Sequence, residues 1–125
     1  MVVKRQTIDQ LEQRLYMLVR MFDFFPDMIG AGQMDGCLTK VNRSFKQAFA
    51  YSEEELHEKP FTSFIHTDDV EKAKQAFEEA AKKEGGIRMD TRFKCKDGSC
   101  KWVEWTVLSS ARENQFIAVG RDISE

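Results

Sequence analysis

The 125-residue sequence predicts an α+β protein: a five-stranded antiparallel sheet, helices on one face of it, and an amphipathic N-terminal helix. Three observations lead to this prediction. Apolar residues recur every three or four positions over residues 5–25, as on one face of a helix. From Ile87 onward, apolar and polar residues alternate with the period of a strand. Two strand-like segments and several short helical ones lie between, which gives the element order of an α+β domain.

The N-terminal helix carries a narrow apolar seam. The residues of this seam follow the a and d spacing of a coiled coil: Ile8, Leu11, Leu15, Leu18 and Phe22. An isolated helix of this length is marginally stable, so the seam needs a partner: a second copy, the protein's own sheet, or both. We therefore expect residues 1–22 to form a flanking dimerisation helix, followed by one domain over residues 23–125.

Two strands and three short helical segments are expected next. Met28–Gln33 and Cys37–Val41 read as strands joined by a turn at Asp35-Gly36, because this dipeptide favours a tight hairpin turn. Asn42 is a suitable N-cap for a helix that carries Phe45 and Phe49 on one face.

The two segments that follow are shorter. Ser52 and Glu55 have the spacing of a capping box, and Pro60 limits the helix that they begin. Phe61–Ile65 has room for a single turn.

The main helix is predicted to begin at Thr67-Asp68-Asp69, with its carboxylates near the positive end of the helix dipole. Gly85-Gly86 should end it, just after Lys82 and Lys83. Its buried stripe should consist of Val70, Ala73, Phe77, Ala80 and Ala81.

The turn at Lys96-Asp97-Gly98 decides the register of the following hairpin. A two-residue loop would place Phe93 opposite Trp102. A three-residue loop with a bulge at Gly98 places Met89 opposite Trp105 and gives one consistently apolar face, so we prefer it. In this register Arg92 lies opposite Trp102 on the other face. Cys95 and Cys100 then lie on opposite faces and should not form a disulfide.

Composition limits the function classes. A net charge of −2 gives no indication of nucleic-acid binding, and no apolar run approaches the roughly 20 residues that span a bilayer. Three cysteines without a Cys-x-x-Cys pair favour reduced thiols in a cytoplasmic domain and no zinc site. No catalytic triad or glycine-rich phosphate loop is evident, so no catalytic residues are assigned.

Four segments in order resemble a PAS domain. Residues 25–56 look like its first two strands and following helices, with Asn42 at the family's characteristic asparagine position. Residues 64–69 resemble its His-Pro-Asp-Asp motif, with threonine in place of proline. Residues 96–107 resemble its central hairpin, and residues 118–125 its closing Asp-Ile-Thr motif, with serine in place of threonine. The likeness covers residues 23–125 and is closest to the Trp-rich subgroup common in bacterial sensor kinases and diguanylate cyclases.

The resemblance implies a cytoplasmic sensory module without enzymatic activity of its own, which dimerises and controls an effector such as a histidine kinase or cyclase. The chain would then be part of a larger sensor protein. Two other hypotheses stay open. One is a ligand-free interaction module with a filled core, and the other is a small α+β enzyme with a cone-shaped cavity.

A pocket is implied between the inner face of the sheet and the helices. Its candidate residues are Asn42, Phe45, Phe49, Phe61, Phe64, Phe77, Met89, Thr91, Val103 and Trp105. These side chains could hold a non-covalent flavin or a small apolar metabolite, or could simply fill the core. Asn42 and Thr91 could orient a ligand or could bind the backbone instead.

The sequence argues against two cofactors that PAS domains use. Covalent flavin chemistry needs a cysteine just after the asparagine, but Arg43 and Ser44 stand there. Haem-binding relatives carry a histidine on the main helix, but His57 and His66 lie outside it, and His66 is more simply a cap. The cofactor is therefore left unknown.

The closing motif implies a signal relay at Arg121 and Asp122. The carboxylate of Asp122 is expected to cap or pair near the C-terminal junction, with Arg43 as one possible partner. The outer sheet face carries Trp102, which suggests a face that residues 8–25 cover.

Overall fold

A computed structural model describes residues 2–82 and 86–124, with side chains from residue 7 onward. The elements in chain order are α1 (Val2–Phe24), β1 (Met28–Gly32), β2 (Leu38–Val41), α2 (Arg43–Phe49), α3 (Glu53–His57), the 3₁₀ turns η1 (Phe61–Phe64) and η2 (Thr67–Asp69), α4 (Val70–Lys82), β3 (Ile87–Lys94), β4 (Cys100–Ser110) and β5 (Gln115–Asp122).

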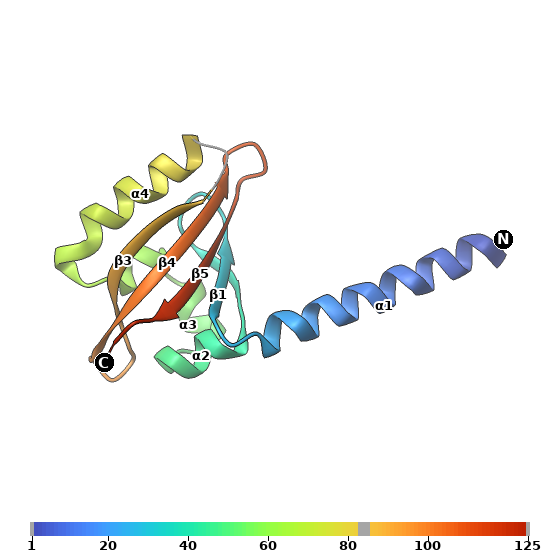
Figure 1. Cartoon of the computed structure of the whole chain (residues 1–125), viewed down its shortest axis with the longest axis horizontal. Coiled ribbons are helices and arrows are strands. Elements are labelled where there is room, and N and C mark those ends of the chain that lie inside the picture. Colours follow the sequence, from blue (N-terminus) through green and yellow to red (C-terminus); the bar gives the residue numbers. More distant parts are fainter. Residues whose placement is uncertain (1, 83–85, 125) are drawn as a thin grey trace.

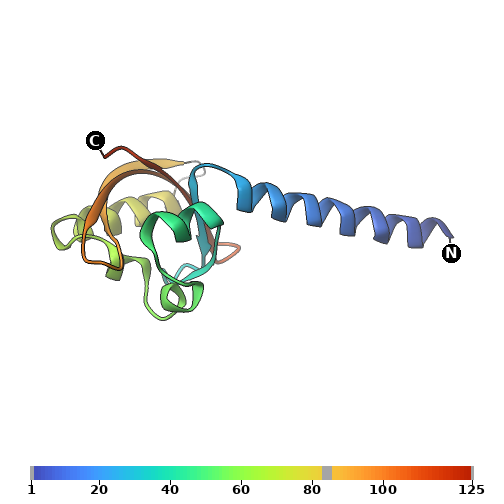
Figure 2. The same ribbon diagram turned by 90° about the horizontal axis from the view of Figure 1, so that it is seen from below.

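The strands form one antiparallel sheet in the order β2-β1-β5-β4-β3, which confirms the predicted α+β fold. The N-terminal hairpin is therefore joined to the C-terminal meander through the pairing of β1 with β5. Figure 2 shows the shorter helices, green and yellow, on the same side of the curved sheet.

The β3–β4 hairpin has the predicted register. Met89 pairs with Trp105, and Arg92 pairs with Trp102. Gly98 has a φ of +91°, which an L side chain rarely adopts, and this position lets the chain reverse within a short loop. Cys95 and Cys100 are both free thiols, as expected from their positions on opposite faces.

The predicted starts of the two short helices α2 and α3 are also confirmed. The Asn42 side chain accepts a hydrogen bond from the amide of Phe45 and so caps α2. Ser52 and Glu55 form the expected capping box at the start of α3.

The main helix differs from its prediction in two respects. Residues 67–69 form a 3₁₀ turn capped by His66, so α4 itself begins at Val70. Ala76, which the prediction left out, is buried, whereas Val70, Phe77 and Ala81 are only half-buried. The line of the helix that faces the sheet runs through Ala73, Ala76 and Ala80, and the other three residues lie at its border. The expected end at Lys83 and Gly85 lies outside the described residues.

Helix α1 extends away from the domain and does not cover the sheet (Figure 1). The expectation that residues 8–25 lie over the outer face is therefore wrong for the single chain, and Trp102 on that face remains 41% exposed. The direction of the helix is set where it ends, because Asn42 and Ser44 donate hydrogen bonds to the carbonyls of Phe22 and Phe25.

The core lies between the inner face of the sheet and helices α2, α3 and α4. It is rich in aromatic contacts: the Phe49 and Phe93 rings are 4.2 Å apart at their centroids, and Phe45 contacts Trp105 at 6.0 Å. Within residues 2–82 and 86–124, no helix is long and apolar enough to cross a membrane.

Candidate sensory core and relay residues

A small cavity of about 30 Å³ lies between the sheet and the helical layer. Its lining is apolar and consists of Leu38, Phe45, Phe61, Ile65, Phe77, Met89, Phe93, Trp105, Val107, Phe116 and Ala118. Ligand sites in proteins usually enclose roughly 300–1,000 Å³, so this core is close to filled. A molecule larger than one or two waters would require side chains to move.

Five of the ten candidate pocket residues line the cavity, and five do not. Those that line it are Phe45, Phe61, Phe77, Met89 and Trp105. The other five are buried around it rather than facing it: Asn42, Phe49, Phe64, Thr91 and Val103. Among the lining residues outside the candidate set are Leu38 and Phe116, which lie on β2 and β5. Alternation could have identified the inner face of β5, where Phe116 and Gly120 are buried. It could not have done so for β2, because Leu38 and Val41 are both buried and the two residues between them are exposed.

The amide of Asn42 is fully buried and fully engaged. Its oxygen accepts hydrogen bonds from the amides of Ile29 and Phe45 at 2.9 and 3.1 Å. Its nitrogen donates to the carbonyls of Phe22 and Asp27 at 2.9 and 3.0 Å. These bonds join α1, β1 and α2 at one point, so the side chain has a structural task and no free group to offer a ligand.

The polar atoms in the centre of the core also satisfy each other. The indole nitrogen of Trp105 donates to the hydroxyl of Thr91 across the β3–β4 pair at 3.1 Å. A buried polar group without a partner would cost free energy, and this bond removes that cost for both side chains. The cavity therefore presents almost no hydrogen-bonding capacity.

Both histidines are engaged with backbone groups. The Nδ1 atom of His57 lies 2.6 Å from the carbonyl oxygen of Leu38. The Nδ1 atom of His66 accepts a hydrogen bond from the amide of Asp68, which confirms the capping role expected for it. Neither histidine lines the cavity. Across the described residues, no three His, Cys, Asp or Glu side chains lie together in a way that could hold a metal ion.

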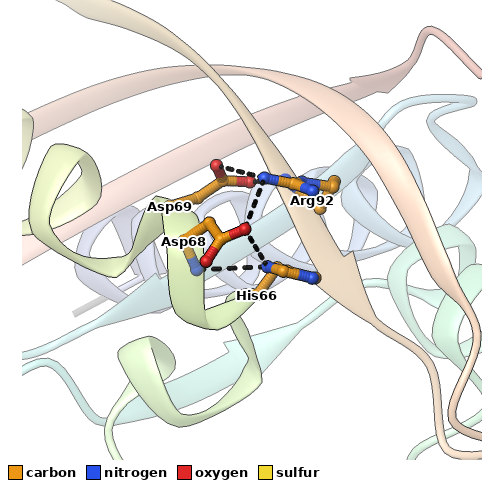
Figure 3. A network of polar contacts seen from close by, with 4 residues as sticks. All are labelled: His66, Asp68, Asp69 and Arg92. Carbon is orange, nitrogen blue, oxygen red and sulfur yellow. Dashed lines mark hydrogen bonds and ion pairs between the residues drawn. The ribbon is translucent and has the colours of Figure 1, made fainter.

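A polar network joins the turn before α4 to strand β3 (Figure 3). Arg92 donates from Nε to Oδ2 of Asp69 and from Nη2 to Oδ1, both at 3.0 Å, and its backbone amide donates to Oδ2 at 2.8 Å. Asp68 lies 3.9 Å from the same guanidinium. These hydrogen bonds from Arg92 lower the pKa of Asp69 to about 2, despite its burial.

The two candidate relay residues lie at the end of β5. Arg121 lies 3.9 Å from the carboxylate of Asp27, and the carboxylate of Asp122 accepts a hydrogen bond from the amide of Ser124 at 2.8 Å. Arg43, one expected partner of Asp122, instead places its guanidinium over the ring of Phe24 at 5.5 Å. Asp122 therefore shapes the chain locally as it leaves the sheet.

Most of the apolar seam of α1 is open to solvent. Ile8, Leu11, Leu15 and Leu18 are between 50% and 62% exposed. Only Phe22 is half-buried, where the helix meets the domain. The domain leaves most of the seam without a partner.

Comparison with known proteins identifies this arrangement. A family model described as the PAS fold matches residues 38–119. The chain belongs to the PAS family. No curated protein sequence is similar enough to the chain to count as a relative.

Solved PAS structures agree with this assignment. The PAS domain of an HTR-like protein from Haloarcula marismortui is 26% identical, with a TM-score of 0.81 over 95% of this chain and 99% of that one. A PAS domain from Colwellia psychrerythraea is 23% identical, with a TM-score of 0.78 over 88% and 97% of the two chains. A domain of a sensor histidine kinase/response regulator from Geobacter sulfurreducens shares the fold at 16% identity, with a TM-score of 0.75 over 90% and 96%.

Proposed function

We propose that this PAS domain is a signal-transducing module that acts as a homodimer through α1 and passes conformational changes to an effector domain. The exposed seam of α1 carries the proposal. It holds a coiled-coil spacing of apolar side chains that its own domain does not cover. A second copy of the same helix is the simplest partner for it. The flanking helix is assigned to residues 1–22 and the PAS domain to residues 23–125.

The likeness to domains of sensor histidine kinases supports a sensory role. In this proposal the effector is a histidine kinase or cyclase that the module regulates in the cytoplasm, and the module itself performs no chemistry. Asp122 and Arg121 are assigned to the junction that leads to the effector.

A ligand-free core is the form of the proposal that the geometry favours. The cavity of about 30 Å³ and its apolar lining leave little room and few polar groups for a ligand. Ligand binding is the second candidate. It is supported by the cavity itself and by two half-buried rings in its wall, Phe61 and Phe77, whose movement would enlarge it.

Sedimentation equilibrium tests the dimer. The double substitution Leu15→Asp with Leu18→Asp places carboxylates in the seam and should convert dimers to monomers. The matched control Gln10→Asp with Met17→Asp adds the same charge to the same exposed helix, outside the a and d positions, and should leave the dimer intact. A dimer that survives the seam substitutions would contradict the assignment of α1 as the interface.

A further inference from the structure

Strand β3 is an edge strand, and the turn before α4 is fastened to its free edge. The amide of His66 donates to the carbonyl of Arg92 at 2.9 Å, and the amide of Arg92 donates to the carboxylate of Asp69 at 2.8 Å. Ile65 and Phe93 form a β-bridge beside them. These bonds tie the start of α4 to β3 at Arg92, so a movement of either one is transmitted to the other.

The guanidinium of Arg92 extends this connection across the sheet. It binds Asp69 with two parallel hydrogen bonds of 3.0 Å, a fixed geometry that only a planar fork can adopt. Its central carbon also lies 4.9 Å from the centre of the Trp102 ring on β4. One rigid group thus touches the α4 turn and the outer face of the sheet together.

The backbone of Trp102 holds the segment in which the chain leaves the sheet. Its carbonyl accepts a hydrogen bond from the amide of Ile123 at 3.0 Å, and its amide donates to the hydroxyl of Ser124 at 2.8 Å. Asp122 accepts from the amide of Ser124 and fixes the same turn. Ile123 and Ser124 are therefore held by the backbone of the residue whose ring lies against the Arg92 guanidinium.

We propose that Asp69, Arg92 and Trp102 couple the position of α4 to how firmly residues 122–124 are held against the sheet. Helix α4 contributes Phe77 to the cavity wall, so a change in the core displaces the helix that begins at this linkage. The route runs through three side chains and one backbone segment, and it does not include Arg121. It deepens the proposed function, because it names the contacts by which the module would bias its effector.

Amide hydrogen exchange of Ile123 measures this coupling, because its hydrogen bond to Trp102 is the last step of the route. Arg92→Lys keeps the positive charge and removes the planar fork. Coupling free energies in proteins usually correspond to a factor of about five or more, so exchange at Ile123 should accelerate by about fivefold or more. Asp69→Asn should have the same effect from the other end. Lys96→Met breaks an exposed ion pair with Glu55 elsewhere and should leave Ile123 unchanged.

A double-substitution cycle separates coupling from general loosening. Once Trp102→Leu has removed the ring, adding Asp69→Asn should accelerate exchange at Ile123 little further. The proposal would be overturned if Arg92→Lys and Asp69→Asn accelerate exchange in α4 and β3 but not at Ile123. It would also be overturned if the increases in the exchange rate of Ile123 caused by Asp69→Asn and by Trp102→Leu multiply in the double variant, because the two residues would then act independently. Sedimentation reports on the dimer independently. If the dimer is intact and exchange at Ile123 does not respond to these substitutions, only the coupling through Asp69, Arg92 and Trp102 is rejected.

Discussion

At the scale of single residues, the buried amide of Asn42 determines how the N-terminal helix joins the domain. Its hydrogen bonds reach Phe22, Asp27, Ile29 and Phe45. Asn42→Ala leaves these backbone groups without their partner in a buried site. We expect a loss of about 3 kcal/mol in the free energy of unfolding, measured by urea denaturation.

Asn42→Asp separates the contribution of the amide oxygen from that of the amide nitrogen. It keeps the oxygen that caps α2 and removes the nitrogen that donates to the carbonyls of Phe22 and Asp27. Hydrogen exchange should therefore accelerate at the end of α1 more than at Phe45. Equal acceleration at both places would contradict separate roles for the oxygen and the nitrogen of the Asn42 amide.

Asp69 makes stability depend on pH in a narrow acidic range. Its pKa is about 2 in the folded protein, against an ordinary value of 3.8, because Arg92 hydrogen-bonds the charged form. A lowered folded-state pKa stabilises the protein above about pH 4, and that contribution is lost as the pH falls towards 2. It amounts to about 2 kcal/mol.

Denaturation between pH 2 and pH 7 tests this assignment. Asp69→Asn should lower stability at neutral pH and should flatten the acidic limb of the curve between pH 4 and pH 2. An acidic limb with the wild-type slope in this variant would mean that other carboxylates produce it.

These two residues show which contacts could be predicted from the sequence and which could not. The capping role of Asn42 was predictable, because it depends on neighbours in the chain. Its bonds to Phe22 and Asp27 were not, because they depend on how α1 approaches the domain. Asp69 was predicted to lie near the positive end of the helix dipole. Its main partner, Arg92, lies on a strand that only the folded structure brings close to it.

At the scale of elements, the hairpins were predictable and the direction of α1 was not. Alternation and the glycine of the turn specify the pairing of Met89 with Trp105 and of Arg92 with Trp102. Periodicity identifies an apolar seam on α1 but does not say what covers it. The cavity is similar: five of its lining residues were named from the sequence, but the inner faces of β2 and β5 were overlooked.

Strand β5 depends on the absence of a side chain at Gly120. A β-carbon there would lie 2.6 Å from the Trp105 ring and 2.8 Å from the Val103 side chain. Because the core around them is nearly filled, Gly120→Ala should destabilise the fold by about 1–3 kcal/mol in thermal or urea unfolding. In a Trp105→Leu background the same substitution should cost less. An equal cost in both backgrounds would show that the Trp105 ring is not what excludes a side chain.

At the scale of the whole molecule, the core is nearly filled, whereas the apolar seam of α1 is open to solvent. The sheet order and the aromatic core leave little space inside the domain, and the exposed apolar surface of α1 lies outside it. In this account the partner that matters most is a second copy of the chain, and signals pass through contacts at the surface of the sheet rather than through chemistry in a pocket.

Native mass spectrometry of the purified protein tests this account most directly. The chain has a mass of 14.5 kDa. We expect a main species at twice that mass, without added ligand, which becomes monomeric when Leu15 and Leu18 are replaced by aspartate. A monomer in the unaltered protein would contradict dimerisation through α1, and a reproducible added mass on each chain would contradict a ligand-free core.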